Sequence, residues 1–171
     1  MPSAAETLAP VAPRLAALSP LTPPERSAGR AMAGLKVLVV DDDFRNVFAL
    51  TALLKRVQVE VVSAESGEQG IAALKQTSDI ALVLVDIMMP EMDGYATMRA
   101  MRRLATGGSL PLVAFTAKVD DGERQRCIDA GASAYIRKPV DTAELLVILG
   151  EWLPAAPPAA PSAAPVAIAL G

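Results

Sequence analysis

Six side chains that could bind a metal or act on a phosphoryl group directly follow apolar runs in this sequence. They comprise a cluster of three carboxylates, one further carboxylate, one hydroxyl and one ammonium: Asp41, Asp42, Asp43, Asp86, Thr116 and Lys138. Singly, each has an ordinary explanation, because acids after a strand often cap the next helix and a lysine before proline is usually solvated. Their repeated occurrence at run ends indicates one shared site instead.

The carboxylates in this group predict a magnesium site. Clustered carboxylates repel one another unless a divalent cation lies among them, and hard oxygen ligands select Mg²⁺ or a similar ion. Neither G-x-G-x-x-G nor G-x-x-x-x-G-K-[ST] occurs, so the chain lacks the usual phosphate loop of a nucleotide-binding domain. An anionic substrate could enter only beside the metal and Lys138, which points to phosphoryl transfer onto an aspartate.

Composition excludes several other functions. The 171 residues contain no histidine, which rules out a Ser-His-Asp hydrolase, a histidine-ligated metal and a phosphohistidine donor. The net charge of −3 makes nucleic acid an unexpected partner. With no signal peptide or membrane span, and with the single Cys127 suited to a reducing compartment, we expect a cytoplasmic protein without membrane contact.

Proline divides the chain into three parts. Six of the 14 prolines lie in residues 1–34 and five in residues 154–171, and both segments are also rich in alanine. This composition predicts disordered tails at both ends. The remaining residues, 35–153, are expected to form one domain that is large enough to bury a core without disulfides.

Within that domain, apolar runs alternate with helical patterns. The predicted strands are residues 36–40, 59–63, 80–85, 111–115 and 134–137. Their continuous apolar character is typical of parallel strands that are covered on both faces. The series predicts an α/β fold with a doubly wound parallel sheet, in which functional groups gather beyond the carboxyl ends of the strands.

Helical spacing predicts which side chains face the core. The predicted core-facing sets are Val47, Leu50, Thr51 and Leu54 in the first helix, Met98, Met101 and Leu104 in the third, and Leu145, Ile148, Leu149 and Trp152 in the last. Asp141 and Glu144 are spaced as a capping box, and Gly131 is placed to end a helix.

Four motifs carry a resemblance to a known family. They are VLVVDDD (37–43), LVLVDIMMPEMDG (82–94), AFTAK (114–118) and GASAYIRKP (131–139). Over residues 36–152 the chain resembles the receiver domain of two-component response regulators, and it is most similar to the receivers of hybrid sensor histidine kinases. The resemblance implies a flavodoxin-like (βα)5 fold with strand order 2-1-3-4-5, and a phosphoacceptor signalling domain rather than an enzyme.

The resemblance also implies the roles of individual residues. Asp86 would be the phosphorylated residue, and Asp41 and Asp42 would place Mg²⁺ together with Asp86 and the backbone carbonyl of Met88. Thr116 and Lys138 would bind the phosphoryl oxygens.

A conformational switch and a phosphodonor are implied as well. Tyr135 would turn inward as Thr116 moves, although an ordinary half-buried strand aromatic is an equal interpretation of Tyr135. The phosphodonor would be a sensor histidine kinase or a histidine phosphotransfer protein. Its identity would be set largely by the first helix around Arg45, Asn46 and Ala49.

Two other functions remain open. A haloacid-dehalogenase-like phosphatase would use Asp41 as its nucleophile, since residues 41–43 satisfy its D-x-D motif. That alternative explains neither Asp86 nor the DIMMPEMDG loop, and the chain is short for a substrate cap. A phosphate-free interaction scaffold would differ only in accepting no phosphate.

Overall fold

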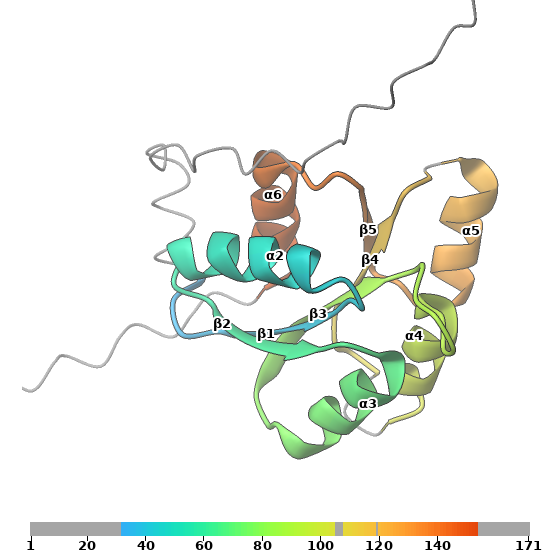
Figure 1. Ribbon diagram of the computed structural model, residues 1–171, viewed down its shortest axis with the longest axis horizontal. Coiled ribbons are helices and arrows are strands. Elements are labelled where there is room, and N and C mark those ends of the chain that lie inside the picture. Colours follow the sequence, from blue (N-terminus) through green and yellow to red (C-terminus); the bar gives the residue numbers. More distant parts are fainter. Residues whose placement is uncertain (1–31, 105–107, 119, 154–171) are drawn as a thin grey trace, which may run out of the picture.

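Five parallel strands and five helices alternate along this chain in a computed structural model, which describes residues 32–104, 108–118 and 120–153 (Figure 1). The strands are β1 (Lys36–Val40), β2 (Glu60–Ala64), β3 (Ile80–Asp86), β4 (Leu112–Thr116) and β5 (Ala134–Arg137). The helices are α2 (Phe44–Arg56), α3 (Gly67–Gln76), α4 (Gly94–Arg102), α5 (Asp121–Asp129) and α6 (Thr142–Trp152). The predicted tails, apart from residues 32–34, lie outside the described residues.

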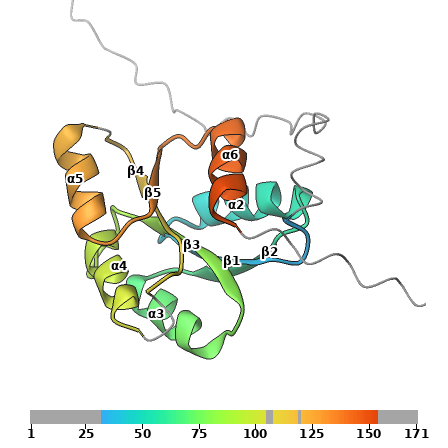
Figure 2. The ribbon, with the colours of Figure 1, turned by 180° about the vertical axis from the view of Figure 1, so that it is seen from behind.

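The sheet has the strand order β2-β1-β3-β4-β5, which confirms the predicted doubly wound fold. Helices α2 and α6 cover one face, and α3, α4 and α5 cover the other, as the front and back views show (Figures 1 and 2). The strand order reverses at β1 and β3: β2 is added on the outer side of β1, whereas β4 and β5 are added on the outer side of β3. In such sheets, ligand sites form at that reversal, beyond the carboxyl ends of the strands.

Successive residues of a strand enter opposite cores. Val37 and Val39 of β1 pack with side chains of α2 and α6, whereas Leu38 and Val40 pack with side chains of α3, α4 and α5. All four are fully buried. This two-sided burial explains why the strands are continuously apolar instead of alternating between apolar and polar residues.

Helix ends are fixed by local hydrogen bonds. Asp141 accepts a bond from the Glu144 N–H at 3.0 Å, which is the forward half of the predicted capping box. Gly131 follows α5 with φ +96°, where a side chain would be strained, and its N–H bonds the Ile128 carbonyl. The Ala132 N–H bonds the Cys127 carbonyl, which completes a Schellman turn and confirms Gly131 as the helix stop.

Two residues lie differently from the sequence prediction. Trp152 was expected to face the core but is 39% exposed, because α6 buries Leu145, Leu146 and Leu149 and ends at Trp152. Met32 was assigned to the N-terminal tail, yet it is 3% exposed and belongs to the core beneath α2 and α6.

No helix in the described ranges is both long enough and apolar enough to cross a bilayer.

Candidate functional site

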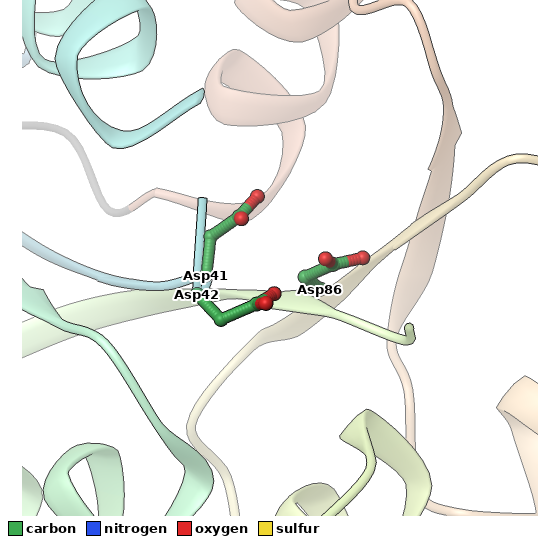
Figure 3. Close-up of side chains that lie close together, drawn as sticks. All are labelled: Asp41, Asp42 and Asp86. Atoms are coloured by element: carbon green, nitrogen blue, oxygen red, sulfur yellow. The ribbon is translucent and has the colours of Figure 1, made fainter. Parts of the chain in front are cut away.

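Three carboxylates converge between the carboxyl ends of β1 and β3 (Figure 3). Asp41 and Asp42 follow β1, and Asp86 is the last residue of β3. Each offers an oxygen atom that lies within 4.8 Å of the others. Asp41 and Asp86 are buried and Asp42 is exposed, so the cluster opens to solvent on the side of Asp42.

Lys138 reaches this cluster from the end of β5. Its Nζ atom lies 2.9 Å from Asp86 Oδ1 and 3.3 Å from Asp41 Oδ2, and its side chain is 25% exposed. One ammonium beside three carboxylates leaves two formal negative charges uncompensated. A divalent cation would balance those two charges, and carboxylate oxygens are the donors that Mg²⁺ prefers. The residues therefore fit a magnesium ion.

Asp41 is the most enclosed member of the cluster. Its Oδ1 accepts the backbone N–H of Asp43 at 2.9 Å, and its Oδ2 accepts the Asn46 side-chain amide at 3.1 Å. Burial raises the pKa of Asp41, while the Asp43 N–H and Lys138 act in the opposite direction. Asn46 was predicted only as a partner-selecting residue, and its amide is also part of the site.

Asp43, the third acid after β1, has a structural role. Its carboxylate caps α2 by accepting the Arg45 N–H at 2.9 Å and pairs with the Arg45 guanidinium at 2.6 Å. The bonds to Arg45 lower the pKa of Asp43 to about 2. Asp43 is therefore an ionised helix cap beside the site.

Asp86 is oriented by the loop that follows β3. Its Oδ1 accepts the Met88 N–H at 3.1 Å as well as the Lys138 ammonium. Met88 belongs to this loop and is 75% exposed. The predicted use of the Met88 carbonyl as a metal ligand stays a prediction.

Thr116 and Tyr135 do not bond the carboxylate cluster in the described structure. Thr116 is 3% exposed at the end of β4, and its hydroxyl bonds the backbone of Lys118 and the carboxylate of Glu123. Tyr135 is half-buried and packs against the core on the side of α3, α4 and α5. Their predicted roles in phosphoryl binding and switching stay predictions.

Glu123 is a neighbour of Thr116 that the sequence does not predict. It is 5% exposed and contacts Thr116 from α5. The only sequence signal near Glu123 is Asp120, a typical helix-capping residue, whose carboxylate accepts the Glu123 N–H at 2.7 Å. A glutamate in the first turn of a helix is ordinarily solvated, so its burial could not be inferred from position.

The doubly wound sheet, with an acidic cluster and a lysine at its carboxyl edge, is that of a receiver-type signalling domain. Residues 37–149 match the family described as the response regulator receiver domain, and the chain belongs to that family.

Its curated relatives include much longer histidine kinases. The chain is 37% identical over 122 residues to hybrid signal transduction histidine kinase L of Dictyostelium discoideum, covering 68% of this chain and 7% of that protein. It is 30% identical over 143 residues to histidine kinase 3 of Arabidopsis thaliana, covering 72% of this chain and 14% of that protein. The chain thus spans only a small part of these relatives.

Solved receiver structures share the fold. The receiver domain of sensor histidine kinase PA1611 from Pseudomonas aeruginosa is 32% identical, with 70% of this chain and 98% of that chain covered and a TM-score of 0.65. That structure has a magnesium ion coordinated in its active site cleft. Chemotaxis protein CheY4 of Vibrio cholerae is 27% identical, with 72% and 100% covered and a TM-score of 0.67.

Proposed function

We propose that this chain accepts a phosphoryl group onto Asp86 from the phosphohistidine of a sensor histidine kinase or phosphotransfer protein. The observation that carries the proposal is the position of Asp86, which is buried at the end of a central strand and bonded to Lys138 and the Met88 N–H. In the reaction, an Asp86 oxygen bonds to phosphorus while the P–N bond breaks. The donor's histidine ring keeps the electron pair of the broken P–N bond. With one proton on its ring nitrogens, it leaves as neutral imidazole.

The remaining residues of the site would bind the phosphoryl oxygens and the metal ion. Lys138, already beside Asp86, would pair with a phosphoryl oxygen, and the Thr116 hydroxyl would turn to donate to another. Asp41, Asp42, Asp86 and the Met88 carbonyl would hold Mg²⁺. When bound, Mg²⁺ would neutralise phosphoryl oxygens and align the group for transfer.

The Mg²⁺ dependence can be tested by calorimetry. An Asp42→Ala variant should bind Mg²⁺ at least tenfold more weakly, because one of three carboxylate ligands is lost. Asp121→Ala, which removes an exposed acid from α5, is the matched control and should bind as the wild type does. Equal affinity in the Asp42 variant would remove Asp42 from the metal site.

The partner surface is proposed to include two exposed aromatic side chains on α2. Phe44 and Phe48 are 73% and 64% exposed, one helical turn apart, and Phe44 directly follows the capping residue Asp43. Large apolar side chains in water beside a reaction site favour contact with a partner protein. We place this encounter in the cytoplasm, where the unpaired thiol of Cys127 is expected to persist.

A panel of purified, autophosphorylated histidine kinases and phosphotransfer proteins tests the whole proposal. At least one should transfer label to the wild-type chain and none to Asp86→Asn. Phe48→Ser should slow transfer from the protein donor but not from acetyl phosphate, and Val147→Ser, an exposed apolar residue of α6, should change neither. A chain that takes no label from any donor, acetyl phosphate included, would favour the phosphate-free scaffold.

Phosphorylation is proposed to act through Thr116 and Tyr135. As the Thr116 hydroxyl turns toward the phosphoryl group, Tyr135 would turn inward and change the surface of α5 and α6. This step is supported by two observations: Thr116 is buried, and Ala114 of the same strand lies in register with Tyr135.

A further inference from the structure

Glu123 is a buried carboxylate that joins three elements beside the phosphorylation site. It lies in α5 and is 5% exposed. Its Oε1 accepts the Tyr95 hydroxyl from α4 and the Thr116 hydroxyl, which lies 3.3 Å away at the end of β4. Its Oε2 accepts the Arg126 guanidinium at 2.6 Å. Both oxygens therefore have hydrogen-bond donors.

The Thr116 hydroxyl bonds Lys118 and Glu123 and none of the three clustered carboxylates. The hydroxyl accepts the Lys118 N–H at 3.1 Å, and its one proton is shared between the Lys118 carbonyl at 2.9 Å and Glu123 at 3.3 Å. A threonine hydroxyl donates one hydrogen bond at a time. To donate to a phosphoryl oxygen on Asp86, Thr116 must give up these acceptors.

Tyr95 and Arg126 fix the carboxylate of Glu123 in place. The Arg126 guanidinium carbon lies 5.8 Å from the centre of the Tyr95 ring, so the two donors also contact each other. Burial, followed by the bond to Glu123, raises the pKa of Tyr95, which keeps its phenol protonated and able to donate. Glu123 cannot easily turn away from Thr116 without losing these partners.

We propose that Glu123 is a positioning residue that holds Thr116 in its resting orientation and thereby opposes occupation of the phosphoryl site. This inference rests on the proposed function, because it assigns Thr116 to phosphoryl binding. A charged acceptor forms a stronger hydrogen bond than a neutral one at equal distance, so the negative charge of Glu123 adds to the hold that the Lys118 carbonyl exerts on Thr116. Removing the charge of Glu123 should therefore make it easier for a phosphoryl group to occupy the site.

The test compares binding of beryllofluoride, a non-covalent substitute for the phosphoryl group, in the presence of Mg²⁺ by calorimetry. Glu123→Gln keeps the size of the side chain but removes its charge, and it should bind beryllofluoride about fivefold more tightly than the wild type. Arg126→Ala loosens the same carboxylate from the solvent side and should tighten binding by a smaller factor. Arg124→Ala, an exposed arginine on the same helix, is the control and should leave the affinity unchanged.

A second readout separates positioning from general destabilisation. The methyl resonance of Thr116 reports its side-chain rotamer. In Glu123→Gln without ligand, it should move toward the position that the wild type shows with beryllofluoride. A variant that was merely less stable would have a lower melting temperature, but its Thr116 resonance would not move toward the beryllofluoride-bound position.

The outcomes distinguish the two proposals. If the wild type binds beryllofluoride while Glu123→Gln neither binds more tightly nor shifts the Thr116 resonance, the inference about Glu123 is wrong and the proposed function stands. If the wild type does not bind beryllofluoride at all, the proposed function fails, and the regulation of it by Glu123 fails with it.

Discussion

Asp86 is 3% exposed, so a phosphodonor would reach it only through a small part of its surface. We expect exposed side chains that closely follow Asp86 and Thr116 in the sequence to control the approach of water. The positions two residues beyond Asp86 and Thr116 are Met88 and Lys118, and both are exposed. Met88 offers water no useful hydrogen bond, and a protonated lysine cannot act as a base.

We expect these two residues to make the phosphorylated state long-lived. Met88→Asn combined with Lys118→Glu should hasten dephosphorylation in Mg²⁺ by about tenfold, the effect of one added hydrogen bond on the attacking water. Decay of the phosphorylated mass over time measures the rate. Unchanged or slower decay would show that these positions do not control water access.

Individual site residues differ in how far the sequence could predict them. Asp41, Asp86 and Lys138 were predictable as neighbours, because the carboxyl ends of parallel strands meet at one edge of a sheet. The bond from Asn46 to Asp41 and the burial of Glu123 were not predictable. Both depend on how a helix rotates against the sheet, and residue type alone does not determine that rotation.

Helix α4 begins in direct contact with the backbone of β3. A Cβ atom on Gly94 would lie 2.3 Å from the Asp86 carbonyl oxygen and 2.7 Å from the Ile87 Cα, so only glycine fits there. The Gly94 N–H also bonds the Ile87 carbonyl at 3.1 Å. Helix α4 therefore holds the end of the loop of residues 87–93 close to Asp86.

The same substitution should have opposite effects in two helices. Gly94→Ala should lower the free energy of unfolding by about 1 to 3 kcal/mol, because backbone atoms must move. Gly150→Ala in α6, where the nearest atom to a new Cβ is Met32 Cε at 3.7 Å, should raise it by up to about 1 kcal/mol through helix propensity. Urea denaturation measures both. Equal effects would show that α4 is not clamped against β3.

At the scale of elements, the sequence predicted every strand to within a residue at each end and the order in which strands and helices alternate. The face of α6 was predicted less well, since Leu146 is buried and Trp152 is exposed. Apolar spacing identifies a helix with one buried stripe. It cannot tell which of several apolar residues lies beyond the edge of the sheet.

The core of the molecule contains a side chain from before residue 35. Met32 is buried, and the Gly34 N–H bonds the Gln58 carbonyl at 2.9 Å, so residues 32–34 attach to the domain. The proline-rich composition of residues 1–34 concealed this, because one apolar residue carries no periodic signal. The predicted boundary at residue 35 therefore omits a side chain that the core contains.

Trimming the chain tests this boundary. Deleting residues 1–30 and 156–171 should leave the melting temperature and phosphorylation nearly unchanged, because those segments carry few side chains that a core could bury. Met32→Ala should instead lower the free energy of unfolding by about 2 to 3 kcal/mol. A clear drop in stability on trimming, or none in the Met32 variant, would contradict this description of the domain.

The central claim is that Asp86 is the residue that accepts the phosphoryl group. Among the described acids, Asp86 alone is the last residue of a central strand, lies beside Asp41 and Asp42, and bonds Lys138. Intact mass spectrometry after treatment with acetyl phosphate and Mg²⁺ should show the addition of one phosphoryl group, absent from Asp86→Asn and mapping to Asp86 in the wild type. An Asp86→Asn chain that still gains the group, or a label on Asp41, would contradict the claim and favour a phosphatase with Asp41 as its nucleophile.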